Sequence, residues 1–380
     1  IYTGEIGRTY SFYSQATDGV NRVEAKTAIS EASTKLVPGS TNPTLNKISD
    51  SIFQLEGEKP KLQVSLIGGN INRVNELGVF VVDDEFGTVN GIKPGADGYT
   101  QAALNRAKVL FSTIFNSPNG FNQKDLSRLL ELNSGDRFGF VLVKDSTIDA
   151  TRSGVSPISS VLLSQPSTQK IEALGNGEYS LAWEDSQGNG AVDFNDLIIK
   201  VAATNQQEPD GAYNQGKLID LSNIIGQVRA EFKLNREAAF NNFVGFYKVS
   251  DMSGGIDTDG NNTIDLRPSD IGYAQAAIQG RIQGINLTVD NQASTTITTN
   301  LSGGSMYAPF IIADGKPDAI LDSNPNNNKD VYFAFAGANP GRFDHIRLLG
   351  NNSWGFEDLS LGGDRDFNDV VVQAKFSRLG

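Results

Sequence analysis

The sequence predicts a mainly β protein that consists of two tandem β-sandwich-like domains, each with a short helical insert. The chain has 380 residues, which is enough for two domains. It contains 40 glycines and many short apolar runs separated by turn residues, a pattern typical of β-sandwiches. Motifs in the first half recur in the same order in the second half. We therefore interpret the two domains as an internal duplication.

The strongest repeated motif is an acidic block near the end of each half. Residues 183–185 (Trp-Glu-Asp) and 356–358 (Phe-Glu-Asp) are each followed, after seven residues, by Asp-Phe-Asn-Asp and an apolar run. Upstream, residues 98–103 and 272–277 share the pattern Gly-Tyr-x-Gln-Ala-Ala. A third pair comprises Gly78-Val79-Phe80 and Gly245-Phe246-Tyr247, each preceded by Asn-Arg, at Asn72-Arg73 and Asn235-Arg236.

The repeat also predicts the domain boundaries. We expect a first β-domain with an N-terminal extension over residues 1–205, a junction over 206–221 and a second β-domain over 222–380. The stretch that follows residue 205 is polar and contains glycine, as linkers often do.

Strands joined by turns are expected to build each domain, because β-branched and aromatic residues dominate its apolar runs. In the first half these runs are Leu62–Ile67, Leu77–Val82, Phe138–Val143, Tyr179–Trp183 and Leu197–Ala202. Their expected counterparts, in order, are Val228–Leu234, Phe243–Val249, Val331–Phe335, His345–Leu348 and Val370–Phe376.

One helix is predicted in the first copy, from Tyr99 to about Phe115. Asp97 can cap it, and apolar residues recur there at three- and four-residue spacing. We expect the second copy to keep only a stub of this helix, because Gly280 and Gly284 interrupt it.

Composition excludes several function classes. The formal net charge is −12 and the isoelectric point about 4.7, which argues against nucleic acid and anionic membrane surfaces as partners. No apolar run approaches the roughly 20 residues that a membrane-spanning helix needs, so membrane insertion is not expected. The chain has no cysteine and one histidine, His345, which excludes disulfides and zinc–thiolate sites. Because the chain begins with Ile1, we interpret it as a processed, exported protein.

The repeated acidic block predicts a calcium loop. Calcium takes six to eight oxygen ligands, and a helix-flanked EF-hand loop supplies them from alternating positions of twelve residues. The block at 185–196 has Gln at position 3 and Asp at position 12, and the block at 358–369 has lost the side chain at position 5. Both blocks run into strand-like sequence, so we expect calcium loops on a β-scaffold. The predicted ligands are Asp185, Gln187, Asn189, Asp193 and Asp196 in the first loop, and Asp358, Ser360, Asp364, Asp366 and Asp369 in the second.

A third acidic loop lies between the second and third apolar runs of the second domain. It begins with alternating acidic residues, but Pro268 stands at position 12 and Gly260 at position 4. Its candidate ligands are Asp257, Asp259, Asn261 and Asp265. For all three loops the alternative is a turn whose Asp and Asn side chains bond their own backbone. The identical acid spacing in two loops favours calcium.

At residues 356–372, "FEDLSLGGDRDFNDVVV", the chain resembles the C-terminal signature of the domain of unknown function 4114. Residues 75–112 and 241–282 also resemble the parts of cyanobacterial members that precede this signature. Such domains occur in secreted and surface proteins of cyanobacteria and other bacteria, often beside calcium-binding repeats. The first copy departs from the signature by carrying Ala-Val at 191–192, where the second has Asp-Arg. The resemblance implies an extracellular, calcium-associated β-domain in two copies.

The motifs bear on three classes of function. An enzyme is not expected, because His345 has no nucleophile motif beside it and the acidic clusters suggest a metal. A calcium-dependent, lectin-like module that binds polysaccharide is the second class. Trp354 and Tyr307 are candidates for stacking on sugar rings. Trp183 and Phe356 hold equivalent places in the repeat, which favours packing beneath the loop instead.

The third class, which we favour, is a calcium-binding structural or adhesive protein of the cell exterior, such as a subunit of a filament, sheath or surface layer. The strand-like segment Thr9–Phe12 precedes the first repeat, and it can pair within its own domain or add to the sheet of a neighbouring molecule.

Overall fold

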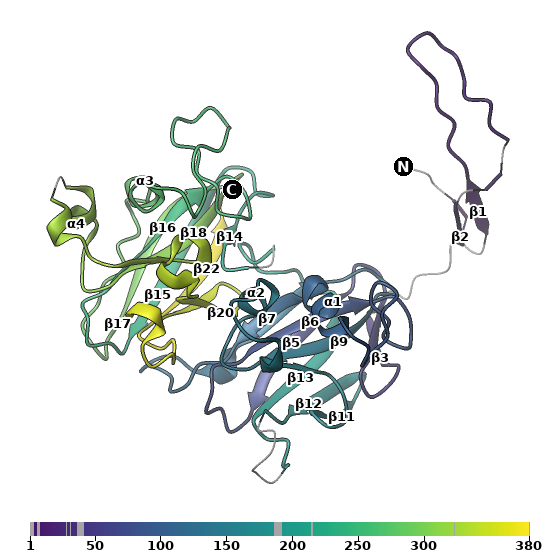
Figure 1. Cartoon of the computed structure of the whole chain (residues 1–380), viewed down its shortest axis with the longest axis horizontal. Coiled ribbons are helices and arrows are strands. Elements are labelled where there is room, and N and C mark those ends of the chain that lie inside the picture. Colours follow the sequence, from purple (N-terminus) through teal and green to yellow (C-terminus); the bar gives the residue numbers. More distant parts are fainter. Residues whose placement is uncertain are drawn as a thin grey trace.

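The computed structural model describes residues 4–5, 8–27, 29–30, 32–35, 42–185, 192–213, 216–322 and 324–379. It is mainly β, with 39% strand and 12% helix, and this confirms the predicted fold class (Figure 1). Pairing between the strands is antiparallel throughout the described residues.

Two sheets pack face to face in the first half. One has the order β3-β4-β9-β6-β7, with β10 paired to β9, and the other has the order β11-β12-β13-β5-β8. The strands of the first sheet are β3 (Thr44–Lys47), β4 (Phe53–Glu56), β6 (Glu76–Val82), β7 (Lys108–Ser112), β9 (Arg137–Val143) and β10 (Val161–Leu163). Those of the second are β5 (Lys61–Gly68), β8 (Ser127–Glu131), β11 (Gln169–Gly175), β12 (Glu178–Trp183) and β13 (Leu197–Thr204).

The second half repeats this architecture. One of its sheets has the order β17-β15-β22-β21-β20, and the other has the order β14-β18-β16, with β19 paired to β18. The first of these contains β15 (Gln227–Arg236), β17 (Ser294–Ser302), β20 (Ile346–Gly350), β21 (Ser353–Phe356) and β22 (Val370–Arg378). The second contains β14 (Ile219–Asp220), β16 (Phe243–Val249), β18 (Met306–Ile312) and β19 (Val331–Phe333).

Comparison of the two halves confirms the duplication and corrects part of the predicted correspondence. Strands β11-β12-β13-β5-β8 occupy the places of β20-β21-β22-β15-β17, in the same order. The counterpart of β9 is therefore β18, which we did not predict, and not β19. Likewise β12 corresponds to β21, and β20 to β11. The two Asn-Arg pairs are not equivalent either, because one lies in a loop after β5 and the other ends β15.

Each half has a layered core. In the first half, apolar side chains from the facing sheets, such as Phe138 and Val201, form one core. Helices cover the other face of the β9–β6 sheet, where Tyr99 and Ile148 pack on it. The second half places Phe310 beneath its own helices in the same way. These helices are α1 (Tyr99–Arg106), α2 (Ile148–Arg152), α3 (Tyr273–Gln279) and α4 (Pro317–Leu321).

In the described part of the chain, none of the helices has the length and hydrophobicity of a membrane span. Single-turn 3₁₀ helices lie in the connections. The 3₁₀ helices are Gln123–Asp125, Ile158–Ser160, Pro325–Asn327, Ala336–Ala338, Pro340–Arg342 and Ser360–Gly362.

The predicted helix in the first copy is too long at its C-terminal end. Ala107 has left the helical conformation, and the residues after it form β7, which pairs with β6. The apolar spacing of Val109, Leu110 and Phe111 fits a strand as well as a helix, and packing against β6 decides between them. Helix α3 ends at Gln279 with Gly280 as its C-cap, so the predicted stop at this glycine is correct. It nevertheless has nearly the length of α1, because α1 is itself shorter than predicted. Gly98, in the left-handed region at φ 81°, occupies the N-cap position that we assigned to Asp97.

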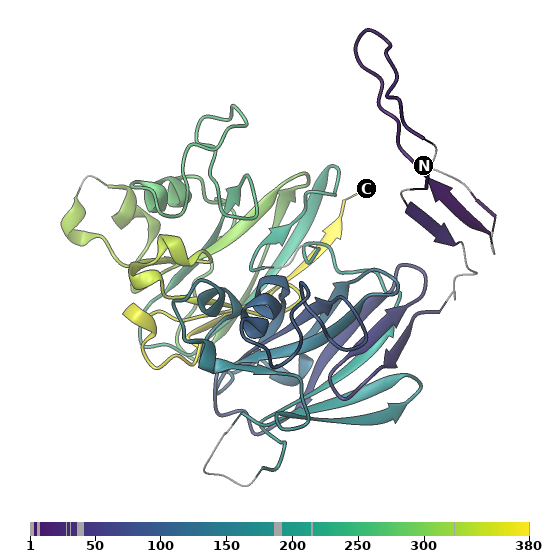
Figure 2. The ribbon, with the colours of Figure 1, turned by 45° about the vertical axis from the view of Figure 1, so that its right-hand side comes forward.

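The N-terminal extension forms a separate two-stranded ribbon. Strand β1 (Thr9–Phe12) pairs with β2 (Ala32–Lys35), and the ribbon stands away from both sandwiches in both views (Figures 1 and 2). Strand β1 therefore pairs in cis, within the extension rather than within the first sandwich. Apolar residues such as Val20 and Ile29 are 68% exposed on this ribbon.

The two halves meet along a seam between edge strands. Strand β20 of the second half lies against β7 of the first. Leu349, Phe367 and Val371 enter the hydrophobic core of the first half. The Asn368 amide donates to two backbone carbonyls of the first half, at 3.2 Å and 3.0 Å. Apolar burial and hydrogen bonds thus both join the halves.

Phe367 and Phe194 test the seam as a matched pair, because they hold the same place in the two acidic blocks. Phe367 is 1% exposed in the core of the other half, whereas Phe194 is half-buried. We expect Phe367→Ala to lower the free energy of unfolding by about 3 kcal/mol or more. Phe194→Ala should lower the free energy of unfolding by a clearly smaller amount. Denaturant unfolding measures both values, and equal losses would contradict this picture of the seam.

Candidate metal centre

The acidic loop of the second half is held by two paired strands. Phe356, at the end of β21, lies opposite Val370, at the start of β22. The loop between them must therefore return to its starting point. The backbone N–H of Asp358 donates to Oδ2 of Asp369 at 2.8 Å and closes the loop. Strand pairing thus brings the first and last acids of the block together.

Carboxylates converge inside this loop around one residue that we did not predict as a ligand, Glu357. Ligand oxygens of Glu357, Asp358 and Asp369 lie within 4.8 Å of one another, and so do those of Glu357, Asp364 and Asp366. Glu357 is fully buried, and its Oε2 has no hydrogen-bond partner. The sequence did carry a signal for it, because a glutamate precedes the first Asp of both repeated blocks.

Burial and mutual repulsion disfavour the ionised forms of these acids. Burial raises the pKa of Glu357, and the charges of Asp369 and Asp364 raise it further. The pKa of Asp369 is raised by burial and by the neighbouring Asp358. Burial also raises the pKa of Asp366, to about 6. A cation at the centre of the loop would reverse these shifts, because it favours the charged carboxylates.

The donor set of this loop fits a hard divalent cation. Calcium prefers carboxylate, carbonyl and water oxygens, and five carboxylates lie in this loop. A cleft of about 330 Å³ next to Asp358, Asp366 and Asp369 gives access from solvent. Ser360, another predicted ligand, lies exposed in the 3₁₀ helix of the loop.

The equivalent loop of the first half is closed in the same way but surrounded differently. The Asp185 N–H donates to Oδ2 of Asp196 at 2.6 Å. Asp193 is exposed and accepts a hydrogen bond from the Asn195 amide. The predicted ligands Gln187 and Asn189 lie outside the described residues.

A buried asparagine supports each loop from below, and sequence reasoning missed both. Nδ2 of Asn75 donates to Asp185 at 2.7 Å, and Nδ2 of Asn242 donates to Asp358 at 2.6 Å. Each asparagine stands three residues before the repeated glycine, Gly78 in the first half and Gly245 in the second. That shared spacing was the signal that could have identified them.

The third predicted loop places its acids near one another on the surface. Oxygens of Asp257, Asp259 and Asp265 lie within 4.8 Å of one another. They mostly bond the backbone of their own loop, as when Asp257 accepts from the N–H groups of Gly260 and Asn262. The Asn261 amide, also a predicted ligand, bonds the Asp259 carboxylate at 3.0 Å.

The aromatic residues considered for sugar stacking are unsuited to it. Trp183 and Trp354 are fully buried and Tyr307 is 3% exposed, because all three pack in the cores. Trp183 and Phe356, which we predicted to pack beneath the loops, are fully buried at the ends of the strands from which the loops start. His345 is also fully buried, with its ring stacked on Tyr332.

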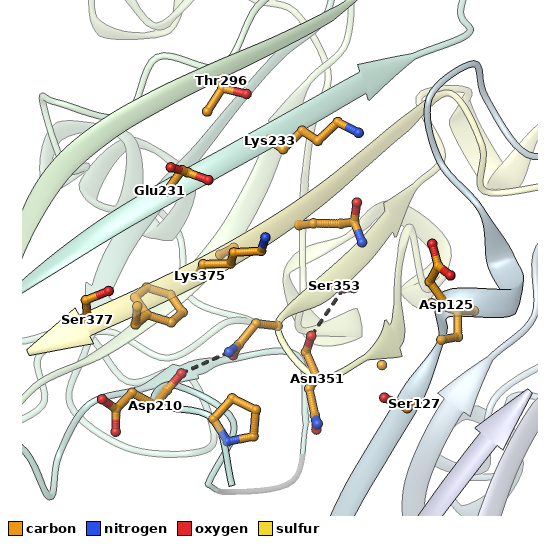
Figure 3. A pocket seen from close by; sticks show the side chains of 17 residues that line it. Asp125, Ser127, Asp210, Glu231, Lys233, Thr296, Asn351, Ser353, Lys375 and Ser377 are labelled. Atoms are coloured by element: carbon orange, nitrogen blue, oxygen red, sulfur yellow. Dashed lines mark hydrogen bonds between the residues drawn. The ribbon is translucent and has the colours of Figure 1, made fainter.

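A polar groove of about 720 Å³ opens where the two halves meet (Figure 3). Its floor is the outer face of β15 and β22, which presents Glu231, Lys233 and Lys375. Its walls come from the first half, at Asp125 and Ser127, and from the connection near Asp210. Amides, hydroxyls and charges of both signs line it, as expected of a site for polar ligands.

Comparison with known proteins agrees with the repeated architecture. The family model named "Domain of unknown function (DUF4114)" matches residues 132–204 and 301–377. No curated protein and no solved structure was found to match the chain. The chain therefore carries the DUF4114 domain signature twice, once in each half, as expected for tandem copies.

Proposed function

We propose that this chain is a calcium-binding structural or adhesive protein of the cell exterior. The observation that carries the proposal is Glu357, a fully buried carboxylate with an unpartnered oxygen among four further acids. Without a partner the ionised form of this carboxylate is strongly disfavoured, and its pKa is raised. A bound cation would stabilise the ionised form and neutralise the acids around it.

Calcium suits this loop better than other cations. The described side chains around it offer oxygen ligands, and the chain has no cysteine to attract softer metals. Magnesium demands tighter octahedral geometry and keeps more of its water, whereas calcium accepts irregular oxygen cages. Extracellular modules bind calcium with dissociation constants of about 10⁻⁴–10⁻³ M. The proposal of an extracellular protein therefore predicts a dissociation constant in this range.

The position of the second loop supports a structural role for the ion. The segment that supplies Asp366 and Asp369 also supplies Phe367 and Asn368, which dock into the first half. An ion that orders this segment would therefore hold the two halves together. We propose that it makes the duplicated domains a rigid block.

The N-terminal ribbon supports assembly with a second copy of the chain. An isolated two-stranded ribbon is marginally stable in water, so it gains from pairing with another sheet. Strand β17 offers an open edge of nine residues without a charged side chain. Such edges accept an added strand. We propose that the ribbon of one molecule adds to β17 of the next, forming a filament, sheath or surface layer.

A polysaccharide-binding module is the second candidate, and the groove of Figure 3 favours it. Amide and hydroxyl side chains such as Asn351, Gln373 and Thr296 can bond sugar hydroxyls there. Neither proposal assigns catalysis. The burial of His345 supports this view, because a base in that place cannot reach a substrate.

Removal of calcium tests the proposed function directly. A ligand that binds only the folded state stabilises it by about 2.7 kcal/mol at a concentration of 100 Kd. For a chain of 380 residues that unfolds as one unit, we expect an unfolding temperature higher by roughly 3–4 °C in excess calcium than in EGTA. Differential scanning calorimetry measures this difference. Identical melting in the two solutions would rule the ion out.

The stabilisation by calcium should also grow as pH rises from about 5 to 8. In the empty folded protein the second-loop acids have raised pKa values, so they hold protons that the unfolded chain has lost. The free energy of unfolding of the empty protein therefore falls as pH rises, whereas calcium displaces these protons. The difference between the two melting temperatures, measured across this pH range, isolates the loop. A constant difference would contradict the proposal.

Assembly is tested by deleting residues 1–41. We expect the full chain to form oligomers or filaments in calcium, seen by light scattering and electron microscopy, and the shortened chain to stay monomeric. The sandwiches begin after this segment, so the deletion should leave melting unchanged as a control. If the full chain is monomeric and binds oligosaccharides, and the Gln373→Ala variant no longer binds them, the second candidate is favoured instead.

A further inference from the structure

The two acidic loops can be compared residue by residue, because the asparagine beneath each fixes the register. In the first half the Asn75 side chain bonds Asp185 and accepts from the Asp145 N–H at 3.2 Å. In the second half Asn242 bonds Asp358 and accepts from the Asp314 N–H, also at 3.2 Å. Positions counted from these residues are therefore structurally equivalent.

Two basic side chains reach the loop of the first half. Arg73, two residues before Asn75, forms an ion pair with Asp145, and its Nε lies 3.7 Å from Oδ1 of Asp185. Lys144 donates from Nζ to the backbone carbonyl of Asp185 at 3.2 Å. The carboxylate of Asp185, whose side chain is 2% exposed, thus has a positive group of the protein beside it.

The second half lacks both of these groups. Phe240 stands two residues before Asn242, and Ala313 stands directly before Asp314. Among the described residues, no lysine or arginine lies within 4.0 Å of a carboxylate oxygen of the second-loop cluster, whose members are Glu357, Asp358, Asp364, Asp366 and Asp369.

Basic residues do lie around the second loop, but none of those described forms an ion pair with its carboxylates. Arg365, in the loop itself, lies over the Phe343 ring. Arg73 borders the same cavity as Asp364 and Asp366. Arg236 donates to the carbonyls of Val289 and Ala238. Lys329 pairs with Asp314 at 3.0 Å, and Arg347 stacks over the ring of Phe367. The second cluster thus has more carboxylates than the first and fewer positive side chains within ion-pair distance of them.

The glutamate before each loop shows the same contrast. In the first half Glu184 accepts hydrogen bonds from the backbone N–H groups of Asp193 and Phe194, at 3.0 Å and 3.3 Å. In the second half Oε2 of Glu357 has no partner. The first loop folds onto its own glutamate, and the second leaves its glutamate available to a ligand.

We propose that Arg73, together with Lys144, takes the place in the first loop of the divalent cation that the second loop binds. This inference rests on the proposed calcium function and assigns the ion to one copy. The first loop is then a latent site, in which protein charges neutralise the acids that an ion would otherwise bind. Arg73, which also pairs with Asp145, and Lys144 place positive charge beside Asp185, so this buried carboxylate is compensated without an external ligand.

Matched substitutions of the last acid in each block test the assignment. Asp369→Asn should weaken calcium binding at one site by at least about tenfold. Asp196→Asn, the same change in the first copy, should leave every calcium affinity within about twofold, because its loop holds no ion. Isothermal titration of the full chain measures both, and the comparison is unaffected by any ion at Asp257.

Removing the internal cations should open the latent site. We expect the double variant Arg73→Phe, Lys144→Ala, which copies the residues of the second half, to bind one calcium ion more than the parent chain. Adding Asp196→Asn should remove that extra ion, and adding Asp369→Asn should remove the other. If the double variant fails to fold, the two single Asp→Asn variants still decide the assignment.

The outcomes separate this inference from the proposed function. Loss of one ion on Asp196→Asn in the parent chain overturns the role of Arg73 and leaves the calcium function standing. A double variant that folds but binds no additional ion also overturns it. Absence of calcium binding to the parent chain overturns the proposed function itself.

Discussion

Repulsion among carboxylates is the constraint on which the rest of the structure depends. The pairing of β21 with β22 forces the two ends of an acidic block together, and Glu357 is buried at its centre. Without a counter-charge these acids must hold protons or push the loop apart. Because Phe367 and Asn368 belong to the same loop, its order determines how the two halves meet. We therefore propose that electrostatics in this loop sets the rigidity of the whole block.

Both copies of the duplicated domain contain a cluster of acidic side chains, and the surroundings of the two clusters differ. The hydrogen bonds that close each loop are the same, and so is the asparagine beneath it. The surroundings differ, with Arg73 beside one loop and Phe240 at the equivalent place in the other. The second loop supplies Phe367 and Asn368 to the seam between the halves. We therefore propose the ion that fastens the seam for this copy.

Much of the fold was predictable, because strand-like runs and repeated motifs are local signals. All ten predicted runs lie in or against strands. The errors arose where packing decides, as at Val109–Phe111, which form a strand although their spacing also fits a helix. Among site residues, Asp358 and Asp369 were predicted from spacing. The buried Glu357 was missed because an EF-hand template has no place for a ligand before its first position. The burial of Trp354 could not be predicted from the sequence, because it depends on how the strands pack.

The distance between the two halves tests the central claim most directly. The chain has no cysteine, so Glu58→Cys and Ser222→Cys, both at exposed positions, allow specific spin labels in each half. Double electron–electron resonance should give one narrow distance distribution in calcium and a broader one in EGTA, because the empty loop no longer orders the seam. The same narrow distribution in both solutions, with calcium shown to bind, would contradict the claim that the ion fastens the halves.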